Sequence, residues 1–205
     1  MRFNQANKII FKKQLGFTFI ELIVASAIIA LIAIISVVNF HTARRSNDIY
    51  LAVDQVADSI ITARNLSLGG QLLTNQTFPA GGYGVNFQRL EDKVFVYAAT
   101  GADTTFDNGE LLPGGTTEFS DIKIIRLCIL TQGMVTNSPC GGSWTIVPEK
   151  LEIVFGLSGN ITVNGINGPI TGASYIGGVL QHEVTSRRAY FYVSLISGTV
   201  TGEVR

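Results

Sequence analysis

The sequence predicts an α+β protein in which one long N-terminal helix precedes a β-rich domain. Residues 17–40 form an unbroken apolar run, and residues 49–63 continue it with apolar residues at helical spacing. From about residue 80 the pattern changes to short runs rich in valine, isoleucine, phenylalanine and tyrosine, separated by turn-forming residues. We expect two small antiparallel sheets packed against the second half of the helix.

The apolar run is long enough to cross a membrane. As a helix, residues 17–40 would extend ~36 Å, against a hydrocarbon layer of ~30 Å. The preceding segment is basic, and this favours a cytoplasmic N-terminus with the rest of the chain outside. A secretory signal peptide usually has a shorter apolar core and a small-x-small cleavage site, neither of which matches well, but a plain anchor stays open. The basic residues are Arg2, Lys8, Lys12 and Lys13, and residues 1–16 contain no acid.

The second half of the helix is expected to be amphipathic. Its apolar residues recur at intervals of four, three, four and three, which places them on one helix face. The pattern ends at Gly69-Gly70, a strong stop signal for a helix. These residues are Ile49, Val53, Val56, Ile60 and Ala63.

Eight strands are expected in the C-terminal part of the chain. Ser158-Gly159-Asn160 and Ser197-Gly198 have the composition of hairpin turns. The predicted strands span residues 83–87, 93–98, 122–130, 144–147, 151–155, 161–163, 189–196 and 199–204.

Glu21 is an acidic residue inside the apolar run. Near a bilayer centre such a side chain costs roughly 2.5–3.5 kcal/mol, and less toward the interface. A residue this unfavourable usually has a partner. If the chain were cut before Phe17, the new α-amino group of a neighbouring subunit could pair with the Glu21 carboxylate.

The residues around this position carry a family resemblance. Lys12-Lys13-Gln14-Leu15-Gly16, followed by Phe17-Thr18-Phe19-Ile20-Glu21-Leu22, resembles the class III signal of type IV prepilins and pseudopilins. The resemblance implies that a prepilin peptidase cuts after Gly16 and methylates the amine of Phe17. It also implies that Glu21 neutralises that amine on an adjacent subunit during filament assembly.

The resemblance further implies a pilin-like fold and a structural, non-enzymatic role. The chain would be a minor pseudopilin or minor pilin of a type II secretion pseudopilus or a type IV pilus. Its partners would be other pilins or pseudopilins, prepilin peptidase, the inner-membrane assembly platform and, before assembly, membrane lipid. It would span the bacterial inner membrane once, with a periplasmic or extracellular domain. The expected parts are a cleaved leader (1–16), the transmembrane and assembly half of the helix (17–40), its amphipathic half (41–69) and the β-rich domain (70–205).

Two further features narrow the resemblance. Many major pilins have a helix-bending proline late in the apolar segment, whereas this chain has no proline before Pro79, which favours a pseudopilin or minor pilin. The stretch Gly82-Tyr83-Gly84-Val85-Asn86-Phe87 and the strand pair around Gly198 are similar to H-type minor pseudopilins and their FimT-like relatives.

The two cysteines, Cys128 and Cys140, both follow the apolar run. If this part of the chain lies outside the cytoplasm, oxidising conditions favour a disulfide that closes a short loop. The alternative is two unpaired small hydrophobic residues.

A possible calcium site lies in the segment 103–110. Asp103, Asp107, Asn108 and Glu110 supply oxygen ligands of the kind that Ca²⁺ prefers, and related secretion subunits hold calcium in a loop. The spacing does not fit an EF-hand. The alternative is a solvated turn around Asn108-Gly109.

A basic patch is expected on the C-terminal hairpin, where Arg187, Arg188 and Arg205 accompany Tyr190 and Tyr192. FimT-like minor pilins include members implicated in DNA uptake through such a region, so DNA binding or an adhesive pilus tip is the alternative function. Against it, the chain without residues 1–16 has 11 basic and 15 acidic residues. Arginines at a strand edge can also serve simply to prevent edge pairing.

The sequence offers little for catalysis. It has only two histidines, and it contains no Gly-x-Ser-x-Gly elbow, phosphate-binding loop or dinucleotide fingerprint. We therefore expect no enzyme and no cofactor other than the calcium considered above.

Overall fold

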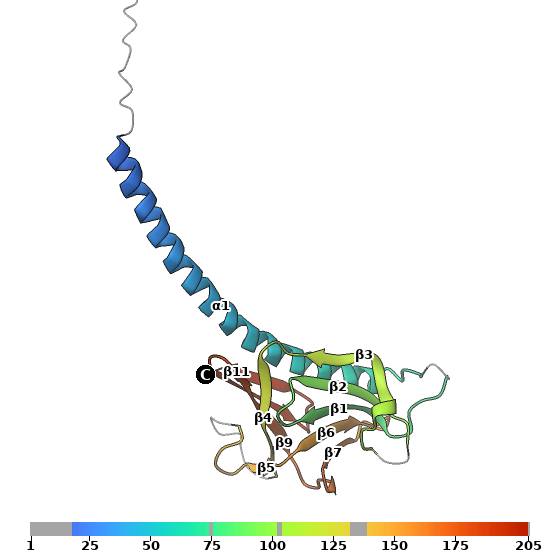
Figure 1. The fold of residues 1–205 in the computed structure, drawn as a ribbon. Helices are drawn as coiled ribbons and strands as arrows, with labels where there is room; N and C mark the ends of the chain where they lie inside the picture. The colour runs from blue at the N-terminus through green and yellow to red at the C-terminus, as the bar shows by residue number, and fades with distance from the viewer. Residues whose placement is uncertain (1–17, 74–75, 102–103, 132–138, 205) are drawn as a thin grey trace, which may run out of the picture. The chain divides into compact units, whose positions relative to one another are not determined.

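The computed structural model describes residues 18–73, 76–101, 104–131 and 139–204 (Figure 1). The chain divides into two compact units, residues 1–43 and residues 44–205. One α-helix belongs to both units, and all the described strands belong to the second unit. These elements agree with the predicted α+β class.

The α-helix of the described residues, α1 (Phe19–Leu68), begins and ends with local hydrogen bonds that explain its bounds. At its start the Glu21 N–H donates to the Thr18 hydroxyl oxygen at 3.3 Å, so Thr18 caps the first turn. At its end Gly70 adopts a positive φ of 60°, and the N–H of Gln71 reaches the carbonyl of Leu66 at 3.1 Å. This is a Schellman ending, and it confirms the predicted stop at Gly69-Gly70.

In the first unit, α1 contains an apolar segment that is long enough to span a membrane. This segment, Phe19–Val37, has a mean hydropathy of 2.8, and 0% of it is buried within the chain. Nothing in the described part of the protein covers this apolar surface. An exposed apolar surface of this length is typical of a segment that lies in lipid or packs against other protein chains.

Two antiparallel sheets make up most of the second unit (Figure 1). The first sheet has the strand order β3-β2-β1-β6-β7-β8, and the second has the order β11-β10-β9-β4-β5. A 3₁₀ turn, η1 (Asn108–Glu110), precedes β3. The strands are β1 (Gly82–Gln88), β2 (Lys93–Ala99), β3 (Leu111–Glu118), β4 (Ile122–Leu130), β5 (Thr145–Val147), β6 (Lys150–Phe155), β7 (Ile161–Gly165), β8 (Gly168–Pro169), β9 (Tyr175–His182), β10 (Arg188–Ser194) and β11 (Val200–Val204).

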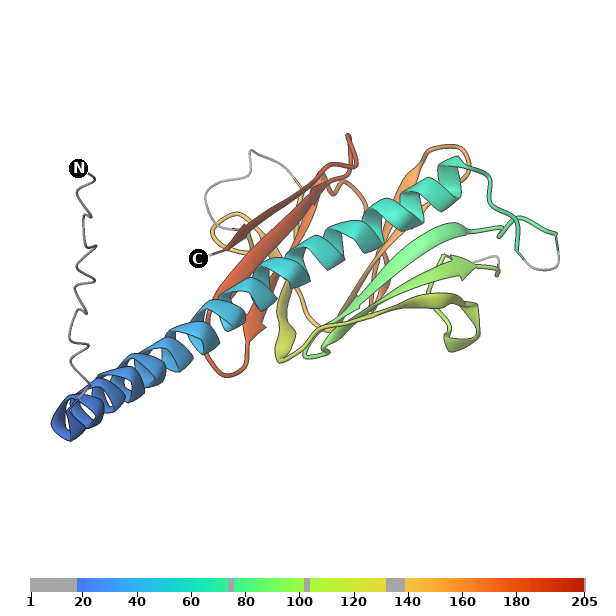
Figure 2. The ribbon, with the colours of Figure 1, turned by 90° about the horizontal axis from the view of Figure 1, so that it is seen from above.

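The main core lies where the second half of α1 meets the inner faces of both sheets. Figure 2 shows this half of the helix passing between β9–β11 on one side and β1–β3 on the other. All five apolar residues of the predicted helix face, from Ile49 to Ala63, are buried in this core. Phe87 from the first sheet and Phe191 from the second also meet there, with ring centroids 5.5 Å apart. The predicted packing of sheets on the helix is confirmed.

Strand β9 is central in the second sheet, and the sequence did not predict it. Its Gly177-Gly178 pair resembles a turn, because glycine is unfavourable inside strands. The structure requires both glycines for packing. A Cβ on Gly178 would lie 2.5 Å from the Phe191 ring on the inner face, and one on Gly177 would lie 3.1 Å from the Trp144 ring on the outer face.

Strands β3 and β8 were also not predicted. Each contains proline and glycine, and each lies at an edge of the first sheet, where a missing N–H donor is tolerated. The eight predicted strands are all present, and their ends agree within two residues. Both predicted hairpin turns are confirmed, and Gly159 and Gly198 have positive φ angles of 77° and 67°.

The buried helix face gives a direct test of this packing. Ile60 is 0% exposed, whereas its neighbour Ile61 is 44% exposed. We expect Ile60→Ala to lower the free energy of unfolding by ~2–5 kcal/mol, because it leaves a cavity in the core. Ile61→Ala, the matched control, should change it by less than about 0.5 kcal/mol. Denaturant unfolding of the detergent-solubilised chain measures both, and equal effects would contradict the assigned helix face.

Candidate functional sites

The N-terminal signal lies partly inside the described structure. Gly16 and Phe17 lie outside the described residues, so the predicted cleavage and methylation positions stay predictions. Glu21 lies in the first turn of α1 with an exposed side chain, and no cation contacts it among the described residues. Within the described residues, no group takes the place of the amine that the sequence predicts as the partner of Glu21.

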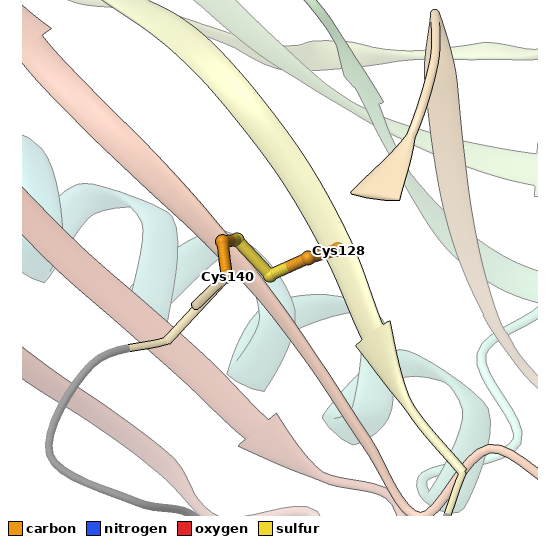
Figure 3. Close-up of a disulfide and its surroundings, with 2 residues drawn as sticks. All are labelled: Cys128 and Cys140. Carbon is orange, nitrogen blue, oxygen red and sulfur yellow. A yellow bond between two sulfur atoms is a disulfide. The ribbon is translucent and has the colours of Figure 1, made fainter. Parts of the chain in front are cut away.

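Cys128 and Cys140 form a disulfide, as the sequence predicts (Figure 3). Cys128 lies in β4, Cys140 precedes β5, and their Cα atoms are 5.3 Å apart. Both residues are buried. The bridge therefore ties Cys140, just before β5, to strand β4.

The disulfide belongs to a second hydrophobic cluster, on the outer face of the second sheet. We call this group the outer cluster. Tyr175, Tyr190 and Tyr192 pack against it and stay partly exposed. Its buried members are Cys128, Leu130, Cys140, Trp144 and Val179.

The predicted basic patch lies beside the outer cluster. Arg187 is exposed just before β10 and Arg188 is exposed at its start, while Arg205 lies outside the described residues. Strand pairing places Lys123 and Gln181 in one row with Arg188, and it places Arg126 in the next row with Tyr190. Sequence reasoning missed Lys123 and Arg126 because they precede the hairpin by about 60 residues and join it only through sheet pairing.

Neighbouring groups partly compensate these cations. Lys123 forms an ion pair with Glu183, and the pKa of the Lys123 amine is raised by its hydrogen bond to that carboxylate. The Arg188 Nε atom donates to Gln181 at 3.3 Å. Of the basic residues on this face, Arg126 is therefore the best placed for an external anion.

The predicted calcium loop is organised by a carboxylate that accepts hydrogen bonds. Glu110 Oε1 accepts from the Thr100 N–H at 2.6 Å, the Thr100 hydroxyl at 2.8 Å and the Gly101 N–H at 3.2 Å. Among the described residues, no group of three or more histidine, cysteine, aspartate or glutamate side chains could hold a metal. Asp103 lies outside these residues, so calcium binding stays a prediction.

A buried polar cluster on the outer face of the first sheet was not predicted. Glu152 is 0% exposed, and its Oε1 atom accepts from Asn86 at 2.9 Å, Lys150 at 3.1 Å and the Phe106 N–H at 3.2 Å. The neighbouring Asn164 donates to the carbonyl of Thr104 at 2.8 Å. These bonds satisfy one oxygen of a buried carboxylate and hold the segment 104–106 on the sheet, while Glu152 Oε2 has no partner in the described structure.

One comparison with known proteins supports the N-terminal signal. Residues 11–37 match the family model of the prokaryotic N-terminal methylation motif. No curated protein and no solved structure matches the chain. The motif and the exposed apolar helix fit a membrane-anchored subunit with a methylation-type N-terminus, and the two antiparallel sheets form its second unit.

More specifically, the N-terminus carries a signal of the type IV pilin and pseudopilin kind, and this signal supports a pilin-type or pseudopilin-type subunit. Assembly with other pilins and processing by prepilin peptidase follow from this signal. The narrower likeness to FimT-like and H-type proteins stays a prediction.

The disulfide gives a prediction on stability. Replacing both cysteines, in Cys128→Ser/Cys140→Ser, should lower the free energy of unfolding by about 3 kcal/mol, because the bridge restricts the unfolded chain. Urea unfolding with and without reductant measures this. Reductant should destabilise the natural chain but leave the double variant unchanged, and equal stability of the oxidised and reduced natural chain would contradict the role of the bridge.

Proposed function

We propose that the chain is a minor pilin or minor pseudopilin that is cut after Gly16, methylated at Phe17 and assembled through the first half of α1. One combination of features carries this proposal. A methylation motif at residues 11–37 overlaps an apolar helical segment that no described part of the chain covers. A plain membrane anchor would need the apolar surface but not the motif.

Glu21 supplies the chemical reason for the cut. Its position in the first helical turn is favourable, because backbone dipoles concentrate positive charge there. In lipid, however, the carboxylate still costs up to roughly 2.5–3.5 kcal/mol. The methylated α-amine of Phe17 on a neighbouring subunit would form a charge-assisted hydrogen bond with it. Assembly would thus relieve a cost that the isolated subunit bears.

The same proposal covers topology and partners. The basic leader keeps the N-terminus cytoplasmic, where prepilin peptidase and the inner-membrane assembly platform act on it. The second unit then lies in the periplasm or outside the cell, and the Cys128–Cys140 disulfide suits that oxidising environment. Assembly would be in a type II secretion pseudopilus or a type IV pilus.

The N-terminus tests the proposal directly. We expect membrane-extracted protein from cells with an active prepilin peptidase to begin at methylated Phe17, as measured by intact mass and N-terminal peptides. Glu21→Gln should leave this processing intact and lower incorporation into sheared filaments or the pseudopilus fraction at least about tenfold, because the amine loses its charged partner.

The control for that variant is Ser26→Ala, on the same apolar segment, which removes only a bond from the Ser26 hydroxyl to the Ile23 carbonyl. It should assemble normally. A natural chain that keeps Met1 would refute the processing, and normal assembly of Glu21→Gln would refute the pairing.

A second candidate function is DNA binding on the outer face of the second sheet. The observation that favours it is the grouping of Arg126 and Arg188 with the partly exposed rings of Tyr190 and Tyr192. Cationic and aromatic side chains on one sheet face suit a flexible, stacked single strand. Outside residues 1–16 the chain has more acidic than basic residues, and this argues for weak binding.

This candidate is tested with a mixed-sequence single-stranded oligonucleotide and the full chain in detergent. If the face binds DNA, the logarithm of affinity should fall linearly with the logarithm of salt concentration. In Arg126→Gln/Arg188→Gln the magnitude of that slope should then fall by about 2, because two phosphate contacts are lost. Lys93→Gln on the first sheet should leave the slope unchanged. Absence of binding at low salt would eliminate this function.

A further inference from the structure

A cavity of about 520 Å³ opens near the C-terminal end of α1, within the second unit. It lies where the last turns of the helix meet the hairpin turns β6–β7 and β10–β11. Arg64 and Ser67 line it from the helix, Asn160 lines it from one turn, and Ile196 and Gly198 line it from the other. It contains none of the residues of the N-terminal signal, the outer cluster or the basic patch.

Arg64 lines this cavity from α1. Among the described residues its guanidinium makes no hydrogen bond or ion pair. It lies against the backbone of Gly198, since a Cβ there would be 2.7 Å from Nη1. Nor is it needed to cap the helix, because the N–H groups of the segment 69–71 already bond to the carbonyls of Asn65, Leu66 and Ser67.

Ser67 supplies a second, independent observation. It is 2% exposed, it lines the same cavity, and it follows Arg64 by three positions, on the same helix face. Its hydroxyl has no hydrogen-bond partner in the described structure. A buried hydroxyl without a partner is unfavourable, so an external acceptor at this point would stabilise the site.

We propose that this cavity binds a carboxylate group presented by a partner protein. A guanidinium binds a carboxylate through two parallel hydrogen bonds, and one adjacent hydroxyl can donate a third. One cation and one hydroxyl match a single negative charge. Two large apolar side chains also stand exposed at the rim, Leu68 at 65% and Ile196 at 86%, and an arginine with an apolar surround is typical of a protein interface.

The partner is identified only through the proposed function. If the chain is a pilin-type subunit in a filament, the carboxylate belongs to an aspartate or glutamate of a neighbouring pilin or pseudopilin subunit. A small free carboxylate shares the chemistry, and the experiment separates it from a protein partner.

Arg64→Lys makes the site reactive. A carbodiimide couples an amine directly to a carboxylate in contact with it, whereas a guanidinium does not couple. We expect membranes that contain the variant to give a crosslink between position 64 and an acidic peptide of another pilin-type protein. Its yield should exceed that of the exposed control Arg89→Lys at least about tenfold, and adding Ser67→Ala should lower it several-fold.

Two results would overturn the inference. One is no crosslink at position 64 in a sample whose N-terminus is methylated Phe17. The other is coupling only within the same molecule.

A second experiment measures the thermal stability of the purified natural chain in detergent, with sodium acetate or with sodium chloride at equal ionic strength. Stabilisation by acetate that Arg64→Gln abolishes, without any protein crosslink, would assign the site to a small ion and reject the protein partner.

The proposed function can fail separately. An N-terminus at Met1 would refute processing, whereas the acetate effect depends only on the cavity.

Discussion

The uncovered apolar surface of Phe19–Val37 is the constraint on which the function of this chain depends. Lipid can cover that surface before assembly, and other apolar helices can cover it afterwards. Under the proposed function, Glu21 would make the two environments unequal, because hydrocarbon offers the carboxylate no partner whereas the N-terminal amine of a neighbouring subunit would. A single acidic residue would then favour the assembled state over the anchored state, which an apolar segment alone would not do.

In the second unit, the second half of α1 packs against both sheets. The face from Ile49 to Ala63 is buried in one core together with the inner faces of both sheets. The outer faces are then secured separately. The disulfide and Trp144 cover part of the second sheet, and Glu152 with Asn164 holds the segment 104–106 on the first.

The sequence predicts features that depend on interactions between residues close in the chain, and it misses features that depend on contacts between distant segments. Helix periodicity, the stop at Gly69-Gly70 and the hairpin turns are local signals, and the structure confirms them. Strand β9 was not predicted because glycine is unfavourable inside strands, whereas the packing here requires both Gly177 and Gly178. Glu152 lies on the outer face of its sheet, where a glutamate is usually in contact with solvent. It is buried because the distant segment 104–106 covers it.

The two proposed contacts place one charged residue near each end of α1 against another subunit. Glu21 near its start and Arg64 near its end each lack a partner of opposite charge among the described residues. Salt should act on them unequally. A pair at Glu21 would lie among apolar helices and be screened little, whereas a carboxylate at Arg64 would enter an open cavity and be screened more. Under the two proposals, contacts at the Arg64 cavity should therefore loosen with salt before the N-terminal helices separate. The helix would then set whether the assembly persists, and the cavity would help to set which neighbour binds.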